Sequence, residues 1–471
     1  MDGSQPEPTR SWKRLPFLRR PPLSEAGFLL AVFLLALGLR LAWIAYANYD
    51  PNDGRFGDDL FYDFMARGLA AGKGYLSAYN AQTALWPPGY SLILAGLYKA
   101  VGHSIISAKV LNAVSASVTV VLVYFIGARV FSKKVGGVAA VMLAVFPGQI
   151  YYSTLILNES LFAFFSTLIL LFSVIWISKG RGVWPPALLL LGILFGWAAL
   201  MRSEALVLLV ATLLVWTFAA PSWRAFAGQG MLVVLGAAIA IAPWMARNEI
   251  AMHGFIPISS GGGHTFLAGH LEDPYGTPYV FPAADLWLKY PDLPYPQREL
   301  KMEREAWREG LDFAKSHPSY EVQLVGEKFY QMYKDDSEAL LWIEGAWPNP
   351  GNLPWLQGSW VAERPEPTPV IVIPRAAERN WARLADRYYF AVLACGLVGV
   401  PLWFSVRDKK RLLLILTVVL WTALHLVFIP NSRYHVSLAP VFCLWAATSL
   451  VFVFDLVKRR LTRNRKESAS P

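Results

Sequence analysis

The chain has 471 residues, of which 55% are hydrophobic and 16% are charged, and its formal net charge is +10. Soluble domains carry about 25% charged residues, so this composition excludes an ordinary soluble protein. Much of the Lys and Arg lies in short segments beside apolar runs, as membrane-topology signals do, which argues against nucleic-acid binding. Cys395 and Cys443 both lie in apolar runs and are poor candidates for a disulfide or a metal site.

Ten apolar runs predict membrane-spanning helices, because a span needs ~20 residues to cross the hydrocarbon core. The runs are 26–47, 105–127, 136–151, 154–177, 184–201, 204–219, 230–246, 388–406, 411–429 and 434–455. The first run is too long for a cleaved signal peptide, so we expect it to be retained. The sequence therefore predicts an all-α polytopic membrane protein of about ten spans.

The predicted spans divide the chain into segments. Residues 1–25 form a basic N-terminal segment, 26–246 an N-terminal transmembrane module, 388–455 the C-terminal transmembrane helices and 456–471 a basic tail. If ten spans alternate from a cytoplasmic N-terminus, the basic loops all fall on the cytoplasmic side. They contain residues 13–20, 129–134, 179–181, 224, 407–411 and 458–466. The pattern predicts a multi-pass protein of the plasma (inner) membrane.

Two long segments, 48–104 and 247–387, then lie on the periplasmic or extracellular side. The first contains an amphipathic stretch, 58–71, and an apolar stretch, 88–101, which is too short to span and is expected in the interface. The second is a mixed segment with helices predicted at 297–315 and 319–333. Residues 348–374 are predicted to be irregular and contain a Pro-rich linker.

Asp58 and Asp59 begin the amphipathic stretch just beyond the first span. On a helix, Asp58 shares a face with Tyr62, whereas Asp59 is turned by about 100°. Only one of the two carboxylates can therefore point squarely into a cleft, and we assign that position to Asp58. A helix N-terminus also accommodates acidic residues that have no catalytic role, so this alternative remains open.

Other polar residues interrupt the apolar runs near the same membrane face, although charge inside a span costs ~2.5–3.5 kcal/mol. Each could be a snorkelling or capping residue when taken singly. Together they predict an outward-facing cavity with one carboxylate base and several cations. The set is Arg40, Glu159, Arg202, Glu204, Arg247, Asn248, Arg433, Tyr434 and His435.

A carboxylate beside cations at a bilayer edge suits a lipid-linked phosphate substrate. The cations would hold the phosphate and stabilise it as it departs, and the carboxylate would accept a proton from an attacking hydroxyl. Other patterns are weaker evidence for a function. Asn158-Glu159-Ser160 matches a glycosylation sequon but lies inside a predicted span. His264 and His270 lack a tight metal-ligand spacing, so a surface-loop role is expected for both.

Several motifs resemble the GT-C polyprenyl-phosphate-sugar glycosyltransferases, which are related to protein O-mannosyltransferases and aminoarabinose transferases. In the first outer segment they are Gly57-Asp58-Asp59-Leu60-Phe61-Tyr62, Gly72-Lys73-Gly74-Tyr75 and Trp86-Pro87-Pro88-Gly89-Tyr90. Further matches are 158–161, 200–205, 243–248, 313–328 and 433–434. Where the family has Asp-Glu, this chain has Asp58-Asp59, which puts the role of the second acid in doubt.

The resemblance implies an inverting transfer from a polyprenyl-phosphate sugar to a hydroxyl of a lipid, glycan or protein acceptor. It makes Asp58 the match to the catalytic aspartate, with Asp59 and Glu159 as further catalytic candidates. The expected substrate-binding set is Tyr62, Arg40, Arg202, Arg247, Asn248, Lys328, Arg433, Tyr434 and His435. Asp58 and Asp59 could bind a divalent metal, although a monophosphate donor makes a metal less necessary.

Two rival functions remain open at this stage. An envelope polysaccharide polymerase or ligase that uses a diphosphate-linked glycan would also place outer arginines beside a membrane core. A transporter of lipid-linked sugars would instead favour polar groups or helix breaks near the bilayer centre in two related halves. The sequence shows no internal repeat, and its charged outliers gather at one face.

Overall fold

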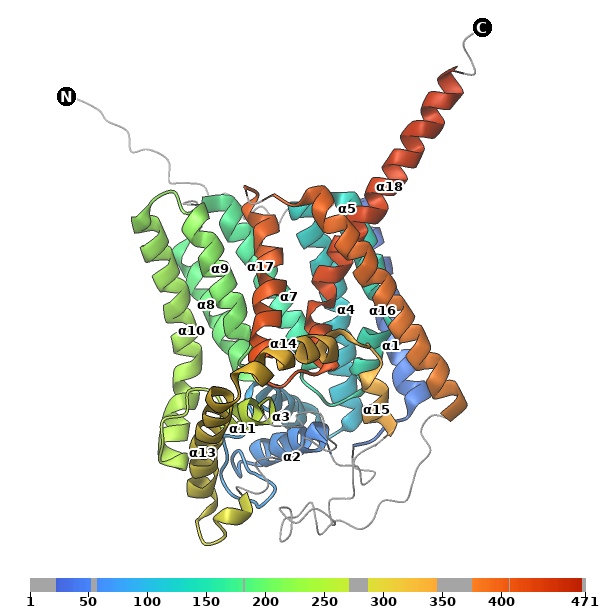
Figure 1. Cartoon of the computed structure of the whole chain (residues 1–471). Helices are drawn as coiled ribbons and strands as arrows, with labels where there is room; N and C mark the ends of the chain where they lie inside the picture. Colours follow the sequence, from blue (N-terminus) through green and yellow to red (C-terminus); the bar gives the residue numbers. More distant parts are fainter. Residues whose placement is uncertain are drawn as a thin grey trace, which may run out of the picture.

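The computed structural model describes residues 23–51, 57–180, 183–270, 287–344, 375–405 and 407–467 (Figure 1). Most of these residues are helical, and the described part contains no β-strand beyond one isolated bridge between Leu76 and Gln82. The predicted all-α polytopic membrane fold is therefore confirmed.

Each of the ten predicted apolar runs forms a helix or part of one. These helices are α1 (Leu23–Ala47), α4 (Ile105–Val130), α5 (Lys133–Ala144) with α6 (Pro147–Tyr151), α7 (Glu159–Lys179), α8 (Pro185–Met201), α9 (Ala205–Ala219), α10 (Trp223–Met252), α16 (Arg375–Trp403), α17 (Lys409–Val427) and α18 (Ala439–Glu467). By length and composition, seven described helices can cross a membrane, and the pair around α5 and α6, bent by 55°, would be an eighth. Helices α8 and α9 have only 17 and 15 residues, so helix length supports fewer spans than the ten predicted.

Two predicted boundaries are wrong. The run predicted at 154–177 becomes a helix only at Glu159, because Tyr152–Thr154 forms a separate 3₁₀ turn, η2, and residues 155–158 are irregular. Helix α16 begins at Arg375 rather than at residue 388, so the predicted outer segment 247–387 includes its first turns. A search for runs of apolar residues does not detect those turns, because they contain several arginines.

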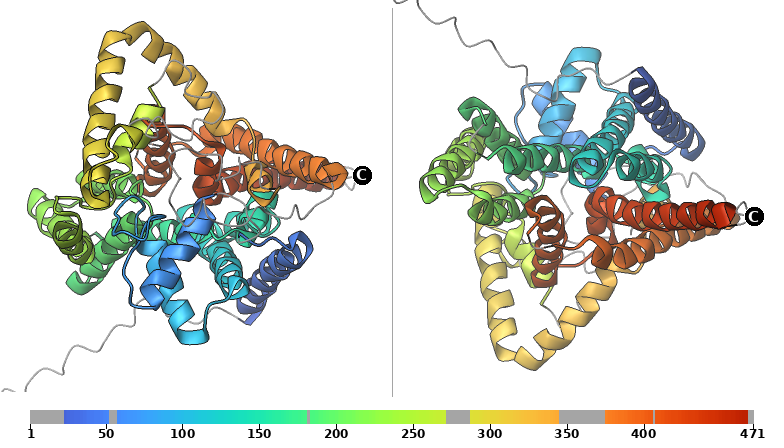
Figure 2. Two further views of the ribbon diagram at one scale, coloured as in Figure 1. Left: turned by 90° about the horizontal axis from the view of Figure 1, so that it is seen from below. Right: turned by 90° about the horizontal axis from the view of Figure 1, so that it is seen from above.

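Shorter helices gather at one end of the bundle and cover it (Figure 1). They are α2 (Asp58–Ala70), α3 (Gly89–Val101), α11 (Gly262–Ala268), α13 (Tyr295–Ser316), α14 (Pro318–Tyr333) and α15 (Glu338–Glu344). The helices predicted at 58–71, 297–315 and 319–333 are confirmed within a few residues. Figure 2 shows α13 and α14 meeting at an angle, where Pro318 begins the second helix. The predicted Pro-rich linker, 348–374, lies outside the described residues.

Basic residues from distant parts of the chain meet at the opposite end of the bundle (Figure 1). Lys133 pairs with Glu25 at 2.5 Å, and Lys134 pairs with Asp455 at 3.0 Å. The Lys410 ammonium group donates to the Arg129 carbonyl at 2.9 Å. The basic segments around residues 129–134 and 407–411 therefore share one end, as the topology prediction requires.

Glycines let α8 and α10 approach closely. A Cβ atom at Gly192 would lie 2.1 Å from the Val233 carbonyl oxygen, and one at Gly236 would lie 2.2 Å from the Leu189 carbonyl oxygen. Small residues at helix crossings allow such backbone contact within membranes. This packing fixes the C-terminal end of α8, where Arg202 follows the last helical residue.

Candidate active site

The candidate site centres on an ion pair between the first residue of α2 and a 3₁₀ turn before α18. Arg433 Nη1 donates to Asp58 Oδ2 at 2.9 Å, and the two side chains remain 18% and 27% exposed, respectively. Gly57, just before α2, allows Trp342 to approach, because a Cβ atom at Gly57 would lie 2.7 Å from the indole ring. The contact therefore joins α2, α15 and the turn η6 (Ser432–Leu438).

The other aspartates of α2 point away from this contact. Asp59 is only 3% exposed, and its Oδ1 accepts a hydrogen bond from the backbone N–H of Leu60 at 2.9 Å. Asp63 is fully buried, accepts from the Tyr98 hydroxyl at 2.7 Å and pairs with Arg67 at 3.0 Å. Asp63 thereby ties α2 to α3, and Asp58 is the acid of this helix that pairs with Arg433.

Behind Asp58, carboxylates and guanidinium groups alternate in a row that we term the charge chain: Asp58, Arg433, Glu159, Arg202 and Glu204. Glu159 Oε1 lies 4.0 Å from Arg433 Nε and 3.1 Å from Arg202 Nη1. Arg202 Nη2 lies 2.9 Å from Glu204 Oε1. Glu159 begins α7, where the helix dipole favours an acid, and Arg202 and Glu204 occupy the turn between α8 and α9.

Burial separates the Asp58 end of the charge chain from its middle. The Glu159 and Arg202 side chains are 2% and 7% exposed, whereas Asp58 and Arg433 keep considerably more accessible surface. A substrate can therefore reach the Asp58 end and not the middle. Glu159 and Arg202 consequently act on any substrate through Arg433.

Asn158 connects the charge chain to Tyr62. Its amide nitrogen donates to the Tyr62 hydroxyl oxygen at 2.9 Å, and its carbonyl oxygen accepts from Arg202 Nη1 at 3.2 Å. Burial, and then the negative charges of Asp58 and Glu159, raise the pKa of Tyr62 well above its ordinary value. The phenol therefore stays protonated. Asn158 was not among the predicted site residues, although it begins both the apparent sequon and the family-like motif 158–161.

Helix α15 holds Arg433 in place. Glu338 Oε2 accepts from the Ser432 hydroxyl at 2.7 Å and from the Arg433 backbone N–H at 2.8 Å. The Arg433 guanidinium also lies 5.2 Å from the centre of the Trp342 ring. Glu338 and Trp342 were not predicted, since nothing in the local sequence relates them to a turn about ninety residues later.

Tyr434 adjoins the charge chain through its aromatic ring. The Arg202 and Arg433 guanidinium groups lie 5.0 Å and 5.4 Å from the ring centre, and the His425 ring lies 4.6 Å away. Tyr434 thus belongs to the cluster, as predicted, and its ring covers both guanidinium groups without supplying a negative charge. Its neighbour His435 faces elsewhere: it is fully buried and contacts the Met332 carbonyl and Asp336 at 2.7 and 3.1 Å.

Arg247 and Asn248, from the end of α10, form a second cluster. Arg247 donates to the carbonyl oxygens of Thr83 and Tyr75 at 2.6 and 3.1 Å and also bonds the side chain of Gln82. Asn248 donates to the Ile256 carbonyl at 2.9 Å. No hydrogen bond or ion pair within the described ranges joins Arg247 to Asp58 or Arg433, so the structure does not assemble these three predicted residues into one contact.

The remaining predicted cations also lie apart from the charge chain. Arg40 is fully buried in α1 and donates to the carbonyl oxygens of Ala36 and Ala144 at 3.0 and 3.2 Å. Lys328 of α14 is 1% exposed, and its burial lowers the pKa of the ammonium group to about 8, against the opposing effect of Glu321. Neither makes an ion pair with a carboxylate in the part of the chain that the structure describes.

His264 and His270 lie in and just after α11. His270 is largely buried, and its ring contacts the Glu321 carboxylate and the Val427 carbonyl, each at 2.8 Å. His270 thus links α14 to α17 rather than sitting in a surface loop. Burial lowers the pKa of His264 to about 4. Among the described residues, no group of three or more His, Cys, Asp or Glu side chains is placed to hold a metal ion.

Comparison with known proteins identifies relatives of the fold. Residues 86–246 match the family model described as dolichyl-phosphate-mannose-protein mannosyltransferase. No curated protein matches the chain in sequence. The predicted resemblance to GT-C transferases is therefore confirmed by a match that covers part of the chain, together with the fold likenesses that follow.

Solved structures of an archaeal oligosaccharyltransferase share the fold. AglB from Archaeoglobus fulgidus, in complex with an inhibitory peptide and a dolichol-phosphate, matches with a TM-score of 0.51 and 16% identity, over 96% of this chain and 53% of that chain. The Archaeoglobus fulgidus enzyme in complex with Zn and sulfate gives a TM-score of 0.53 and 14% identity, over 94% and 51%. The chain thus spans about half the length of these relatives.

A structure of a different protein also matches. ArnT from Cupriavidus metallidurans bound to undecaprenyl phosphate gives a TM-score of 0.41 and 12% identity, over 91% of this chain and 78% of that chain.

Proposed function

We propose that the protein is an integral membrane glycosyltransferase that moves a sugar from a polyprenyl-phosphate donor to an acceptor hydroxyl, with inversion at the anomeric carbon. The observation that carries this proposal is the Asp58–Arg433 pair, in which a partly exposed carboxylate lies 2.9 Å from a partly exposed guanidinium. Asp58 is the general base, and Arg433 contacts the donor phosphate.

The proposed reaction needs one base and one cation. Asp58 accepts the proton of the acceptor hydroxyl, whose oxygen attacks the anomeric carbon of the donor. The bond between that carbon and the phosphate oxygen breaks, and polyprenyl phosphate leaves with the bonding electron pair. Arg433 stabilises the charge that grows on the leaving phosphate, and Glu159 and Arg202 keep its guanidinium oriented.

The other predicted residues receive different roles in this proposal. Tyr62 orients the Asp58 end of α2 through Asn158. Arg247 and Asn248 shape the loop above the site rather than holding phosphate. Lys328 is a second candidate phosphate contact, because it is a buried cation without an ion-pair partner among the described side chains.

The orientation follows from the charge asymmetry between the two ends of the bundle. The end that gathers Lys133, Lys134 and Lys410 fits the cytoplasmic side of a plasma membrane. The active site would then face the periplasm or the cell exterior. Labelling of a cysteine introduced near Asp58 by a membrane-impermeant reagent tests this, and labelling only after the membrane is opened would contradict it.

Substitution of the base tests the reaction. Membranes that contain Asp58→Asn should lose at least roughly 100-fold in sugar transfer from a panel of radiolabelled polyprenyl-phosphate hexoses and pentoses, as expected for removal of a general base. Asp455→Asn, which breaks an exposed ion pair with Lys134 at the other end, is the matched control and should stay active. Wild-type activity of Asp58→Asn at normal protein levels would exclude Asp58 as the base.

One observation favours a second candidate. The fold is shared with an enzyme described as an oligosaccharyltransferase, which suggests transfer of a whole glycan from a diphosphate-linked lipid. Supplying a polyprenyl-diphosphate oligosaccharide in the same assay separates the two, because only the second candidate consumes it.

A further inference from the structure

The first half of α16 carries an arginine stripe, which we define as Arg379, Arg383 and Arg387. The three residues recur every fourth position, which turns each by roughly 40° from the last, so they share one side of the helix. All three are exposed. None makes an ion pair or hydrogen bond with another residue in the described ranges, so the positive charge of this face is not neutralised there.

The arginine stripe continues into the part of α16 that faces lipid. Phe390, Leu397 and Val398 lie on the same side of the helix and are 45%, 59% and 66% exposed. A helix whose exposed face turns from apolar to cationic has passed from the hydrocarbon core into the headgroup layer. The three guanidinium groups therefore project among lipid headgroups rather than towards the centre of the bundle.

The acids of α16 do not neutralise the arginine stripe. Asp386 accepts hydrogen bonds from the Asp336 backbone N–H at 2.9 Å and from the Ser337 hydroxyl at 3.4 Å. Glu378 lies about 100° back from Arg379 and makes no ion pair with the stripe among the described residues. The charges of the stripe thus remain available to an external anion.

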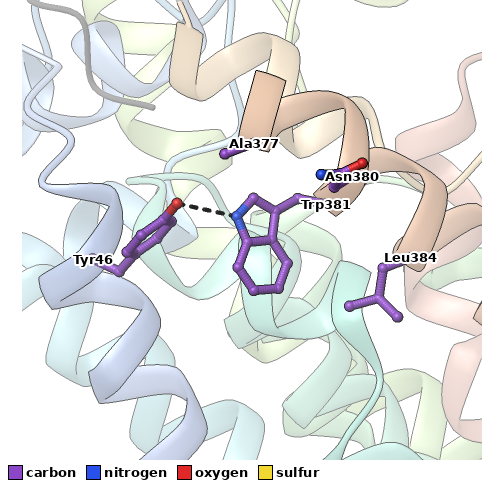
Figure 3. Close-up of a pocket in the computed structure, with 5 residues that line it drawn as sticks. All are labelled: Tyr46, Ala377, Asn380, Trp381 and Leu384. Atoms are coloured by element: carbon purple, nitrogen blue, oxygen red, sulfur yellow. Dashed lines mark hydrogen bonds between the residues drawn. The ribbon is translucent and has the colours of Figure 1, made fainter. Parts of the chain in front are cut away.

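A hollow of about 330 Å³ lies beside the arginine stripe, between the end of α1 and the start of α16 (Figure 3). Trp381 Nε1 donates to the Tyr46 hydroxyl at 3.2 Å across it. Tyr and Trp at this depth mark the membrane–water interface. Asn380 and Leu384 line the hollow and directly follow Arg379 and Arg383 in sequence, so each lies about 100° around the helix from its arginine and the stripe borders the hollow rather than lining it.

We propose that the arginine stripe and the adjoining hollow bind the phosphate-bearing headgroup of an anionic membrane lipid. The arginines pair with the phosphate, Asn380 offers its amide to the headgroup, and the acyl chains run along Leu384 and the apolar face below. Unlike Arg433, Arg202 and Arg67, which pair with carboxylates, the three arginines of the stripe have no acidic partner among the described residues. A lipid anion supplies the missing counter-charge.

The lipid site adjoins the candidate active site. Asp386 holds the 336–337 turn, and the next residue, Glu338, fixes the backbone of Arg433. An anionic lipid bound on α16 is therefore connected to the charge chain through Asp386, the 336–337 turn and Glu338. The inference concerns binding alone and holds whether or not the proposed transfer reaction is correct.

Native mass spectrometry of the full-length protein tests the site, with added phosphatidylglycerol or phosphatidylcholine of matched acyl chains. We expect the wild type to prefer phosphatidylglycerol by roughly 100-fold, since each basic residue near a surface contributes about a fivefold preference for anionic lipid. Arg379→Gln/Arg383→Gln/Arg387→Gln should abolish this preference. Arg383→Gln alone should lower it about fivefold and serves if the triple variant does not insert.

The matched control removes three exposed cations from α13, away from the hollow: Arg304→Gln/Arg308→Gln/Lys315→Gln. It should keep the preference of the wild type. Equal loss in both triple variants, no preference in the wild type, or displacement of the lipid by inorganic phosphate alone would each overturn the proposal. Because these readouts need no sugar donor, they are independent of the transfer assay.

Discussion

Two arginines, Arg433 in the turn η6 and Arg247 near the end of α10, have opposite surroundings. The Arg433 guanidinium lies among carboxylates, 2.9 Å from Asp58 and 4.0 Å from Glu159. The Arg247 guanidinium donates instead to the backbone carbonyls of Thr83 and Tyr75 and lies 4.8 Å from the Trp244 ring. A charged ligand can compete for the first arginine, whereas the second is committed to neutral acceptors.

The carboxylates nearest each arginine show the same contrast. Asp58 keeps an exposed edge, but Glu299 is buried and accepts hydrogen bonds from Thr83, the Ala84 N–H and Ser260. Burial raises the pKa of Glu299 despite these bonds. Glu299 and Arg247 thus clamp the 75–84 loop from two sides, and we call this pair the loop clamp. An ion pair that is open to a substrate can take part in catalysis, whereas hydrogen bonds to the backbone stabilise the fold.

The largest effect is expected in the middle of the charge chain. Arg202→Met leaves Glu159 and Glu204 without their shared cation and should destabilise the protein by roughly 3–5 kcal/mol, as breaking a buried pair does. Thermal unfolding in detergent measures the loss. Arg202→Met/Glu204→Gln should recover part of it, and an unchanged midpoint for Arg202→Met would show that this pair is not structural.

A smaller effect, on turnover, is expected at the open end. Arg433→Lys keeps the charge but loses the planar fork that reaches Asp58 and Glu159 together, so kcat/KM should fall by roughly 10- to 100-fold, or ~1.4–2.7 kcal/mol. The same change in Arg411, which pairs with Asp408 at 3.1 Å at the other end, is the control. Similar losses in both variants would remove the functional distinction drawn for Arg433.

The sequence predicted the helices better than it predicted which polar residues meet. Apolar runs, together with the His317-Pro318 break, located the membrane helices and α13 and α14, because hydrophobic patterning and proline act locally. The sequence also predicted that Asp58, rather than Asp59, would point into a cleft, since the two positions differ by about 100° on a helix. In the structure Asp58 pairs with Arg433, and Asp59 is buried.

The partners of these residues depend on packing between distant segments. Arg433 and Arg247 resemble each other in sequence, since each lies at the outer end of an apolar run, but only tertiary contacts give one a carboxylate and the other a carbonyl. Glu338 illustrates the same limit, because its role depends on α15 packing against η6. Arg40 was predicted to lie in the site, and nothing in the local sequence argued against this. In the structure Arg40 is buried in α1 and donates to backbone carbonyl oxygens away from the charge chain.

The loop clamp should show a local effect of about 1–3 kcal/mol, which is typical of removing the donor to several buried acceptors. Arg247→Gln is expected to speed amide hydrogen exchange in residues 75–84 by tenfold or more, while exchange at Asp58 and Arg433 changes little. Lys73→Gln, an exposed change beside the same loop, provides the control. Faster amide exchange at Arg433 instead would show that the loop clamp and the charge chain form one structural unit.

The smallest effect concerns pH and the outer helix α13. Burial raises the pKa of Glu303 from 4.5 to about 7, although Gly263 N–H and Trp307 both donate to it at 2.9 Å. The folded state therefore binds this proton more tightly than the unfolded state, so the stabilisation is complete below pH 4.5 and is lost as pH rises to about 7.

Glu303→Gln should consequently gain roughly 1–3 °C in melting temperature relative to the wild type between pH 5 and pH 8. Glu309→Gln, at a carboxylate 40% exposed on the same helix, should shift the melting temperature equally at both pH values. A Glu303→Gln difference that is constant with pH would mean that Glu303 is ionised throughout. The contrast between buried and open carboxylates would then rest on Glu299 alone.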